Sequence, residues 1–418
     1  MKKRILSLLL TVAMMLSVMT ILPISVSAET NTFNANDESP LISTAADLVA
    51  FAAAVDGGNN FSGKTVKLAA DIDLSGVENF SDIGAASSKP FSGSFDGQGH
   101  AITNFKQSMG KFDGQGGLFA MVRVPANGTV EIKNFTIDGT MTYNITGDSY
   151  CVGTVVSCLD AGTDKTAKGT FTMQNVRSSV TIQVNGSSGT VYGVGGLLGF
   201  TRHATDVTDL TVNIDSCVYD GNMNFGRITR FVGGIMGTAG RNVSNRDVTI
   251  NITNTVFAGN INLPWYSTDV ATFACLTRDQ DVENKGGLIV ANITDCISAG
   301  KIFFQEEQTY DSYEYGIACS TVYGDVLKMN VKNLYYVPFG IPSDNASGER
   351  IVEIVQEGKN ANNYTCDANS GAKTLDEISS LTAADFSENA KFSFKANTDI
   401  DTYYPCPTGL VKEGAWVD

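Results

Sequence analysis

The chain has 418 residues, with 29 Lys and Arg against 44 Asp and Glu, and a formal net charge of −15 at pH 7. Such a surface repels nucleic acid and anionic lipid, so we expect neither as a partner, whereas basic or neutral partners remain compatible with it. Only 17% of the residues are charged, and 42 glycines accompany a 43% apolar content, which is typical of β-rich folds with many tight turns.

The first 28 residues have the pattern of a secretory signal. Basic residues at 2–4 precede an apolar stretch that reaches about Ile24, and Val26-Ser27-Ala28 supplies the small residues of a cleavage site. An uncleaved anchor is the alternative. No later segment is long and apolar enough to span a bilayer. We expect a mature chain that is secreted, extracellular or loosely associated with the cell surface.

Residues 29–60 are predicted to be an N-terminal capping segment with one short helix over 43–56, STAADLVAFAAAVD. Thr44 and Asp47 have the spacing of a capping box, and Gly57-Gly58 ends the helical pattern. Four residues share one apolar face at helical spacing, namely Leu48, Phe51, Ala52 and Val55.

Residues 61–340 repeat a short pattern of an apolar residue, any residue, a small polar residue and usually another apolar one. The small polar residues stand at steps of 30, 41, 41, 38, 41 and 38: Asn104, Asn134, Asn175, Ser216, Asn254, Asp295 and Asn333. Such side chains tolerate the left-handed backbone region and bond to nearby backbone. We therefore predict a turn at each position, with the side chains stacked in ladders.

Glycine-led apolar segments lie between these turns, at 114–122, 150–158, 192–200, 231–239 and 315–323. A period near 40 fits a propeller blade or a parallel β-solenoid. Few Asn-Gly or Asp-Gly pairs stand where a propeller needs hairpins. We predict an all-β chain, a right-handed parallel β-helix over 61–340 with about two coils per period, followed by an irregular C-terminal cap over 341–418.

The segment FSGSFDGQGHAI, residues 91–102, is predicted to be a folding device rather than a catalytic loop. Its apolar residues alternate toward the core, and Asp96 is placed to accept bonds from the turn amides that follow it. His100 is expected to close the turn with a hydrogen bond. The three glycines are expected to permit sharp turns with positive φ: Gly93, Gly97 and Gly99.

Two glycine-led segments carry a resemblance to a known group. Gly196-Leu197-Leu198-Gly199 matches a Gly-Leu-any-Gly motif, and Gly234-Ile235-Met236-Gly237 differs from it by Ile for Leu. With the segments 47–76, 83–105 and 401–411, they make the chain resemble the secreted bacterial β-helix repeats called GLUG proteins. The resemblance covers about 41–411 and implies the fold much more specifically than the function.

Coils related to GLUG repeats occur in adhesin-like proteins and upstream of the protease domain in some immunoglobulin A peptidases. Those peptidases need a His-Glu-x-x-His zinc helix. This chain has only two histidines, His100 and His203, so the resemblance does not carry that activity over.

Aromatic side chains in two polar segments are candidate binding residues, because exposed rings stack on sugar faces. They are Trp265, Tyr266, Tyr310, Tyr313 and Tyr315. Local packing beneath long loops is the alternative interpretation.

Arg202 and Arg241 follow equivalent strands one period apart and could form a small basic row for a carboxylate or sulfate sugar, with polar turns as the alternative. Catalysis is a second hypothesis, with His203 and Asp206 as acid–base groups. Carboxylates alternate in a further segment and could bind Ca²⁺, but the segment lacks the glycine turn of a calcium loop, which favours a solvated loop: Asp279, Asp281 and Glu283. No cofactor or metal is otherwise predicted.

Eight cysteines in a chain with a secretory signal raise the question of disulfides. Cys217 and Cys296 share a repeat position two periods apart, or four predicted coils, which is roughly 19 Å at the spacing of stacked strands. That distance is too long for a bridge. Cys366 and Cys406, in the irregular tail, are the favoured pair.

The sequence thus predicts a secreted, non-catalytic β-helix protein for extracellular binding, either adhesin-like or glycan-binding. Its expected partner is an extracellular glycan or a host or cell-surface protein. The alternatives are a β-helix polysaccharide lyase or glycoside hydrolase, and a purely structural surface or stacking module.

Overall fold

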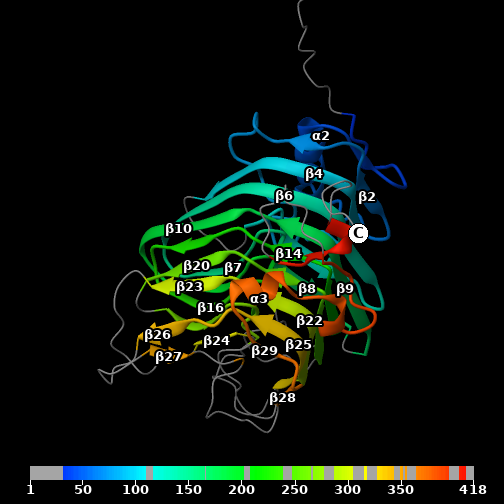
Figure 1. Ribbon diagram of the computed structural model, residues 1–418. Coiled ribbons are helices and arrows are strands. Elements are labelled where there is room, and N and C mark those ends of the chain that lie inside the picture. Colours follow the sequence, from blue (N-terminus) through cyan, green and yellow to red (C-terminus); the bar gives the residue numbers. More distant parts are fainter. Residues whose placement is uncertain are drawn as a thin grey trace, which may run out of the picture. The chain divides into compact units, whose positions relative to one another are not determined.

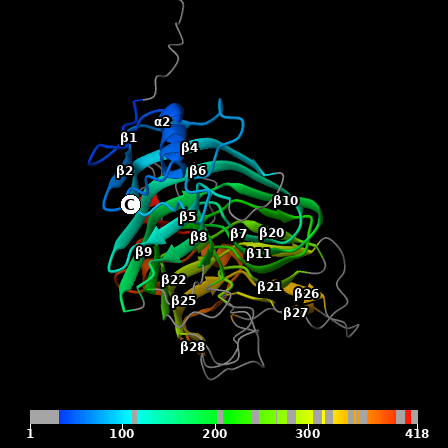
Figure 2. The same ribbon diagram turned by 180° about the vertical axis from the view of Figure 1, so that it is seen from behind.

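The computed structural model describes residues 32–109, 116–164, 166–201, 208–238, 247–264, 267–276, 287–304, 315–317, 327–342, 349–351, 354, 364–394 and 404–410. The signal-like segment lies outside these residues. Within them the chain is a parallel β-solenoid, whose stacked strands are shown from opposite sides in Figures 1 and 2. All strand pairs of its three main sheets are parallel in the described part of the chain.

The first sheet has 18 described strands: β1 (Leu41–Ile42), β2 (Thr65–Leu68), β3 (Ile72–Asp73), β4 (Ser94–Met109), β6 (Thr129–Thr146), β9 (Lys168–Ser178), β10 (Thr181–Ser188), β13 (Asp209–Asp215), β14 (Val218–Tyr219), β15 (Met223–Phe225), β18 (Val248–Thr253), β19 (Val256–Phe257), β20 (Asn260–Leu263), β22 (Ile289–Ser298), β23 (Lys301–Phe304), β25 (Leu327–Tyr336), β28 (Tyr364–Cys366) and β29 (Gly371–Ala372). The second sheet contains β7 (Ser149–Gly153), β11 (Val191–Gly195), β16 (Thr229–Gly233), β21 (Thr268–Ala271) and β24 (Tyr315–Gly316). The third contains β5 (Phe119–Val124), β8 (Val156–Ala161), β12 (Leu198–Thr201) and β17 (Met236–Thr238). Outside them, β26 (Gly340–Pro342) pairs antiparallel with β27 (Glu349–Ile351).

Each sequence period is one coil of the solenoid. Met141 pairs with Ile182, and Ile182 pairs with Met223, so the same residue position returns after 41 residues. The chain passes once through the first, second and third sheets between such partners. The prediction of two coils per period is therefore wrong, because the polar turns and the glycine-led strands are two sides of one coil.

The polar column turns the first-sheet strands as predicted. Six of its residues have φ between 50° and 60° and lie opposite one another on successive coils: Asn134, Asn175, Ser216, Asn254, Asp295 and Asn333. Their side chains form ladder bonds, since Asn175 Nδ2 donates to Asn134 Oδ1 over 3.1 Å and Asn333 Nδ2 donates to Asp295 Oδ1 over 2.7 Å.

Asn104 does not belong to this column, although its φ is 58°. It follows Ile102, which pairs with Ile137 beyond the turn, and its backbone N–H donates to Asp138 over 2.8 Å. A bulge that contains Gln98 takes the place opposite Asn134, with Gln98 at a φ of 52°. This shift explains why the first step of the repeat is only 30 residues.

The glycine of the GLUG-like motif has a packing role. A Cβ on Gly196 would lie 2.0 Å from the Gly234 carbonyl oxygen and 2.2 Å from the Tyr219 ring, and a Cβ on Gly234 would lie 2.5 Å from the Phe257 ring. The Tyr219 and Phe257 rings stack in the core with centroids 6.2 Å apart. Glycine is therefore required where a large ring fills the coil from the opposite side.

In the coils on either side, the glycine position holds a larger residue and the position of the aromatic ring holds a smaller one. Thr154 replaces the glycine in one coil and its Oγ1 lies 2.7 Å from Ser178 Oγ, while Ser298 Oγ donates to Thr272 Oγ1 over 2.9 Å in another. A threonine at the glycine position thus contacts a serine at the position of the aromatic ring, and the two side chains form a hydrogen bond. The core volume stays constant from coil to coil, as close packing requires.

We predict that Gly196→Ala destabilises the protein by about 3 kcal/mol or more, because the new methyl group overlaps backbone oxygen as well as the Tyr219 ring. Urea denaturation followed by circular dichroism measures this loss. Gly76→Ala is the control, since a Cβ there has no atom within 4 Å, and it should change stability by less than about 0.5 kcal/mol. Equal stability of the two variants would contradict the packing role.

The N-terminal end is covered by α2 (Ala45–Asp56), which confirms the predicted helix. Thr44 Oγ1 accepts the Asp47 N–H and the Asp47 carboxylate accepts the Thr44 N–H, both over 3.1 Å, so the capping box is present. The predicted apolar face is buried. The centroid of the Phe51 ring lies 5.2 Å from that of Phe61 and 5.5 Å from that of Phe91. These contacts close the first coil.

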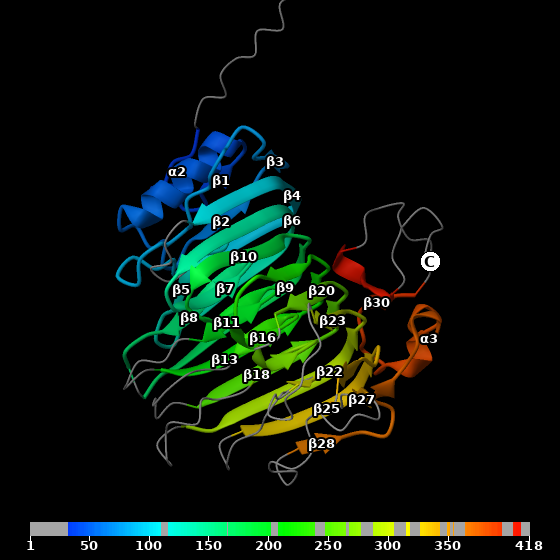
Figure 3. The same ribbon diagram turned by 90° about the vertical axis from the view of Figure 1, so that its left-hand side faces the viewer.

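The C-terminal part runs back along the outer face of the first sheet. It contains α3 (Leu375–Ser379), the 3₁₀ turn η3 (Ala383–Asp385), the antiparallel pair β30 (Phe392–Ser393) and β31 (Cys406–Pro407), and the 3₁₀ turn η4 (Thr408–Leu410). We call the described residues 374–394 and 404–410 the strap. Figure 3 shows it in orange and red beside the stacked strands. The predicted short helix within 375–386 corresponds to α3 and η3.

The strap covers an apolar stripe that points away from the main core. Four outward residues on successive coils belong to it: Val218, Val256, Ile297 and Tyr335. They form a second buried cluster with strap residues that include Ile378, Leu381, Phe386, Phe392 and Tyr404. The C-terminal region thus contains a cover for the side of the first sheet.

The expected disulfide between Cys366 and Cys406 is absent, because both thiols are free. Cys366 lies on β28 in the last coil, whereas Cys406 is buried by the strap near Arg177, several coils earlier. Cys217 and Cys296 are unbridged, as predicted, although they are two coils rather than four coils apart.

Phe386→Ala should release the strap while leaving the coils folded. The Phe386 ring packs on Phe392 at 4.8 Å and on Tyr335 at 5.3 Å, and its loss removes about 3 kcal/mol of docking energy. Cleavage of the strap in limited proteolysis should accelerate roughly a hundredfold. Leu375→Ala, at a side chain that is already 36% exposed, should leave the cleavage rate unchanged. Loss of the whole β signal in Phe386→Ala would instead show that strap and coils unfold as one unit.

Candidate functional site

Most of the side chains predicted to bind a ligand lie outside the described residues: Trp265, Tyr266, Tyr310, Tyr313, Arg202 and Arg241. The alternative catalytic and calcium candidates also lie outside them: His203, Asp206, Asp279, Asp281 and Glu283. Tyr315 begins β24, where its backbone pairs with Val270.

The strands on either side of these candidates separate them into two groups. The two arginine segments connect the third sheet to the first on adjacent coils, after β12 and β17. The two aromatic segments connect the first sheet to the second on adjacent coils, after β20 and β23. In chain order the arginines therefore precede strands of the first sheet, and the aromatic residues follow strands of that sheet.

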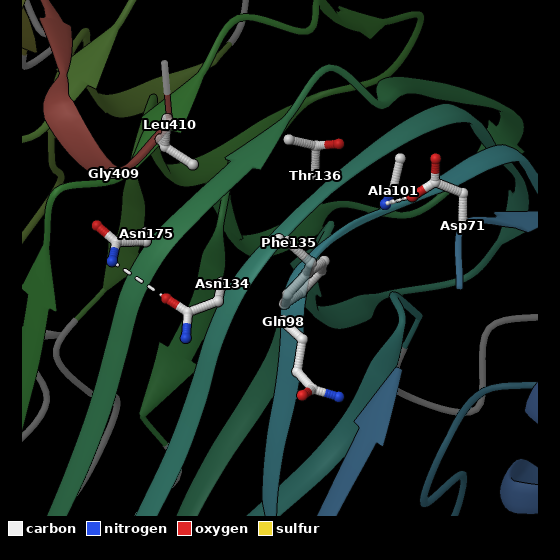
Figure 4. Close-up of a pocket in the computed structure, with 10 residues that line it drawn as sticks. Asp71, Gln98, Ala101, Asn134, Phe135, Thr136, Asn175, Gly409 and Leu410 are labelled. Carbon is white, nitrogen blue, oxygen red and sulfur yellow. Dashed lines mark hydrogen bonds between the residues drawn. The ribbon is translucent and has the colours of Figure 1, made fainter. Parts of the chain in front are cut away.

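A pocket of about 520 Å³ lies on the outer face of the first sheet, where the strap ends. Figure 4 shows its lining, which comes from the residue before β3, from β4, β6 and β9, and from η4. The lining residues are Asp71, Gln98, Gly99, Ala101, Asn134, Phe135, Thr136, Asn175, Gly409 and Leu410. Distant parts of the sequence thus meet at one site.

The carboxylate of Asp71 is held by the FSGSFDGQGHAI segment. Its Oδ1 accepts the Ala101 N–H over 2.9 Å and lies 3.1 Å from His100 Nδ1. His100 makes the expected hydrogen bond, but its partner lies on the preceding coil, so the prediction that it closes its own turn is wrong. The Asp71 side chain remains 75% exposed, so it presents negative charge at the pocket.

The glycines of this segment differ in their roles. Gly99 has a φ of 84°, whereas Gly93 and Gly97 do not have positive φ. A Cβ on Gly97 would lie 2.3 Å from the Phe135 Cβ, so that glycine allows close approach of two coils rather than a left-handed turn. Asp96 Oδ1 accepts the Gln98 N–H over 2.9 Å, as predicted.

Neutral amides make up most of the polar lining. Asn134 donates to Asp96 Oδ1 over 3.0 Å and accepts from Asn175 Nδ2, and Gln98 Nε2 donates to the Leu68 carbonyl over 2.5 Å. These bonds fix the amide orientations before any ligand arrives. The arrangement is suited to hydrogen-bonded recognition of a ligand.

The described residues contain no group of three or more His, Cys, Asp or Glu side chains that could hold a metal ion. Calcium binding by the acidic segment near Asp279 stays a prediction, since that segment lies outside them. In the same described part, no helix is long and apolar enough to cross a membrane.

A buried carboxyl group, Asp82, has a strongly perturbed pKa, which often marks a functional residue. Burial raises the pKa of Asp82 to about 8, and the negative charge of Asp56 acts in the same direction. The side chain is only 5% exposed and accepts a hydrogen bond from Gln107 Nε2, while Gln107 Oε1 accepts the Gly117 N–H over 2.9 Å. A substrate cannot reach Asp82, so we interpret this group as structural.

Asp82→Asn should therefore stabilise the protein increasingly as the pH rises. The folded-state pKa of Asp82 lies above its unfolded value, so the wild-type chain loses stability between about pH 4 and pH 8, by up to about 1.4 kcal/mol per pH unit. Asparagine keeps the acceptor for Gln107 without ionising. Urea midpoints at pH 5 and pH 8 measure the difference between the two proteins. A difference that is the same at both pH values would show that Asp82 ionises freely.

The comparisons with known proteins identify no family for this chain. No family model matches the chain, and no curated protein matches it. A matching solved structure is that of a protein described as a putative immunoglobulin A1 protease from Bacteroides ovatus, with a TM-score of 0.44 and 16% sequence identity, over 91% of this chain and 95% of that one. The GLUG resemblance therefore rests on the motifs in the sequence.

Sequence reasoning missed the pocket because its residues were assigned only structural roles. Asn134 and Asn175 were recognised as turn residues, and Asp71 and Thr136 were not singled out. One signal was available. The outward residue two places after each column residue is polar in the coils beside the pocket and apolar in the coils under the strap: Thr136 and Arg177, then Val218, Val256, Ile297 and Tyr335.

Proposed function

We propose that the protein is a non-catalytic, adhesin-like binding protein that acts outside the cell. The observation that carries this proposal is the pocket of about 520 Å³ at the end of the strap, a size suited to a small ligand or to part of a larger one. The secretory pattern of residues 1–28 supports an extracellular site of action.

The chemistry of the pocket favours binding over turnover. Hydrolysis of a glycoside generally needs two carboxyl groups that face each other across the scissile bond. Asp71 is the one carboxylate among the described lining residues, and its Oδ1 already bonds to Ala101 and lies close to His100. The other polar side chains of the lining are amides and a threonine hydroxyl, and these groups orient a ligand without exchanging protons with it.

The aromatic and arginine candidates form a second part of the proposal. Trp265, Tyr266, Tyr310, Tyr313 and Tyr315 would stack on sugars, and Arg202 and Arg241 would hold acidic groups. A large extracellular glycan or cell-surface protein could then contact several parts of one solenoid.

The purified protein should be retained by at least one member of a panel of plant, mucin, bacterial and host cell-surface ligands, without releasing new reducing or unsaturated ends. Ala101→Trp should weaken retention at least tenfold, because an indole fills the pocket that Ala101 lines. Affinity electrophoresis and surface plasmon resonance measure retention, and a reducing-end assay measures release.

Thr142→Trp is the matched control, because Thr142 lies on β6 six residues beyond Thr136 and does not line the pocket. It should bind as the wild-type protein does. Steady release of sugar ends by the wild-type protein would overturn the proposal and favour a lyase or hydrolase.

A further inference from the structure

The strap shows what the polar column binds. The Ser387 N–H donates to Asp295 Oδ1 and the Lys391 N–H donates to Asn254 Oδ1, each over 2.9 Å. Asp295 and Asn254 belong to adjacent coils, so the strap climbs the solenoid one coil at a time. Side chains of the column thus act as acceptors for the backbone of a polypeptide that crosses the coils.

A lysine adds charge to this recognition. Lys391 Nζ lies 2.6 Å from Asp215 Oδ2, next to the column in the following coil. The same carboxyl group accepts Asn254 Nδ2 through Oδ1 over 2.8 Å. These bonds lower the pKa of Asp215 although burial opposes them, so the carboxylate stays ionised beside the lysine. In addition to its apolar contacts, the strap therefore docks through backbone N–H groups and one basic side chain.

The pocket continues the same column beyond the end of the strap. Gly409 packs so closely on Asn175 that a Cβ there would lie 2.2 Å from Asn175 Oδ1. Asn134 and Gln98 occupy the next two coils and line the pocket. At about 4.8 Å per coil, two coils span about 10 Å, which is the length of about three extended residues.

The acceptor geometry in the pocket matches that beneath the strap. Asp295 Oδ1 accepts the ladder bond from Asn333 and also the strap N–H from Ser387. Asn134 Oδ1 accepts the equivalent ladder bond from Asn175, and Figure 4 shows this bond at the open side of the sheet. A carbonyl oxygen has two lone pairs, so Asn134 can accept a second N–H in the same way.

Charge at the pocket also follows the strap's pattern. Asp71 lines the pocket with a side chain that is 75% exposed, and Asp96 bonds to Asn134, much as Asp215 bonds to Asn254. The protein carries a net charge of −15, which attracts a basic partner from a distance.

We propose that the pocket binds an extended peptide segment of a partner protein, about three residues long. The segment donates backbone N–H groups to the side-chain oxygens of Asn134 and Gln98 and places a lysine or arginine beside Asp71. This inference rests on the proposed binding function and names the partner as a basic, extended polypeptide. Thr136, in the open coil, is polar where the strap-covered coils have Val and Ile, so the segment binds by hydrogen bonds rather than by apolar burial.

Fluorescence anisotropy with labelled five-residue peptides tests the inference on the full-length protein. The peptide Thr-Lys-Thr-Lys-Thr should bind saturably, and the matched peptide Thr-Glu-Thr-Glu-Thr should not. A lysine peptide with N-methylated backbone at alternate positions should bind about tenfold more weakly, because it lacks one or two N–H donors. Equal binding of the lysine and glutamate peptides would overturn the inference.

Protein variants locate the peptide. Asp71→Asn should weaken the lysine peptide about threefold to fivefold, and Ala101→Trp should abolish its binding. Asp148→Asn is the matched control, since Asp148 is also exposed and accepts a backbone N–H, from Thr190 over 2.9 Å, and it should bind normally. Unchanged peptide binding by Ala101→Trp would overturn the inference.

Two further outcomes distinguish this inference from the proposed function. In the first, the wild-type protein binds no peptide but is retained by a neutral glycan, and Ala101→Trp loses that retention. This outcome would make the pocket a sugar site and overturn only the peptide inference. A variant that ends at Leu410 and binds the lysine peptide more than tenfold more tightly would show that the chain's own residues 411–418 occupy the pocket, which also overturns it. Absence of binding to every glycan, peptide and cell-surface ligand would remove both.

Discussion

A residue with a left-handed backbone turns each coil of the first sheet, and the rest of the structure depends on where its side chain then points. The backbone turn lets the strand bend without losing its pairing to the coils on either side, because every coil bends at the same place. The side chain is left on the outer face, where Asn175 bonds to Asn134 and Asn333 bonds to Asp295. The column therefore presents a regular row of acceptors and donors to whatever lies outside, and both the strap and the pocket use that row.

The inner side of the coil is governed by volume. Gly196 and Gly234 face Tyr219 and Phe257, while Thr154 faces Ser178 across the same narrow space. Because protein interiors are close-packed, neither column can change alone without a clash or a cavity. The GLUG-like motif thus describes one half of a pair of complementary columns. This physical reason for the glycine is independent of any function, which is why the motif indicates the fold and says little about ligands.

The sequence predicted the parts of the fold that follow from residue chemistry. Asn, Asp and Ser at fixed steps predicted the left-handed turns, and Thr44 with Asp47 predicted the capping helix. It did not predict a second left-handed column in the second sheet, where Cys151 and Phe231 have φ of 66° and 59°. Bulky side chains avoid that backbone region, so their residue types do not predict the turn. The one indication is that both residues lie opposite a glycine, Gly193, on the coil between them. The prediction of two coils per period was wrong for a similar reason, since composition does not indicate whether two strands belong to one coil or to two.

The candidate site was harder to predict, because it depends on a segment that is distant in sequence. The repeat alternates, so the residue two places after the column should face water and be polar. Thr136 and Arg177 obey this rule, whereas Val256 and Ile297 break it. An apolar residue that recurs at an outward position on successive coils requires a cover, and its return to polar residues marks where the cover ends. The irregular tail supplies Phe386 and Phe392 to that stripe and reaches only as far as Asn175. The outward positions of the repeat therefore indicate where the covered coils end. The pocket lies at that boundary because the polar column continues beyond the last described residue of the strap.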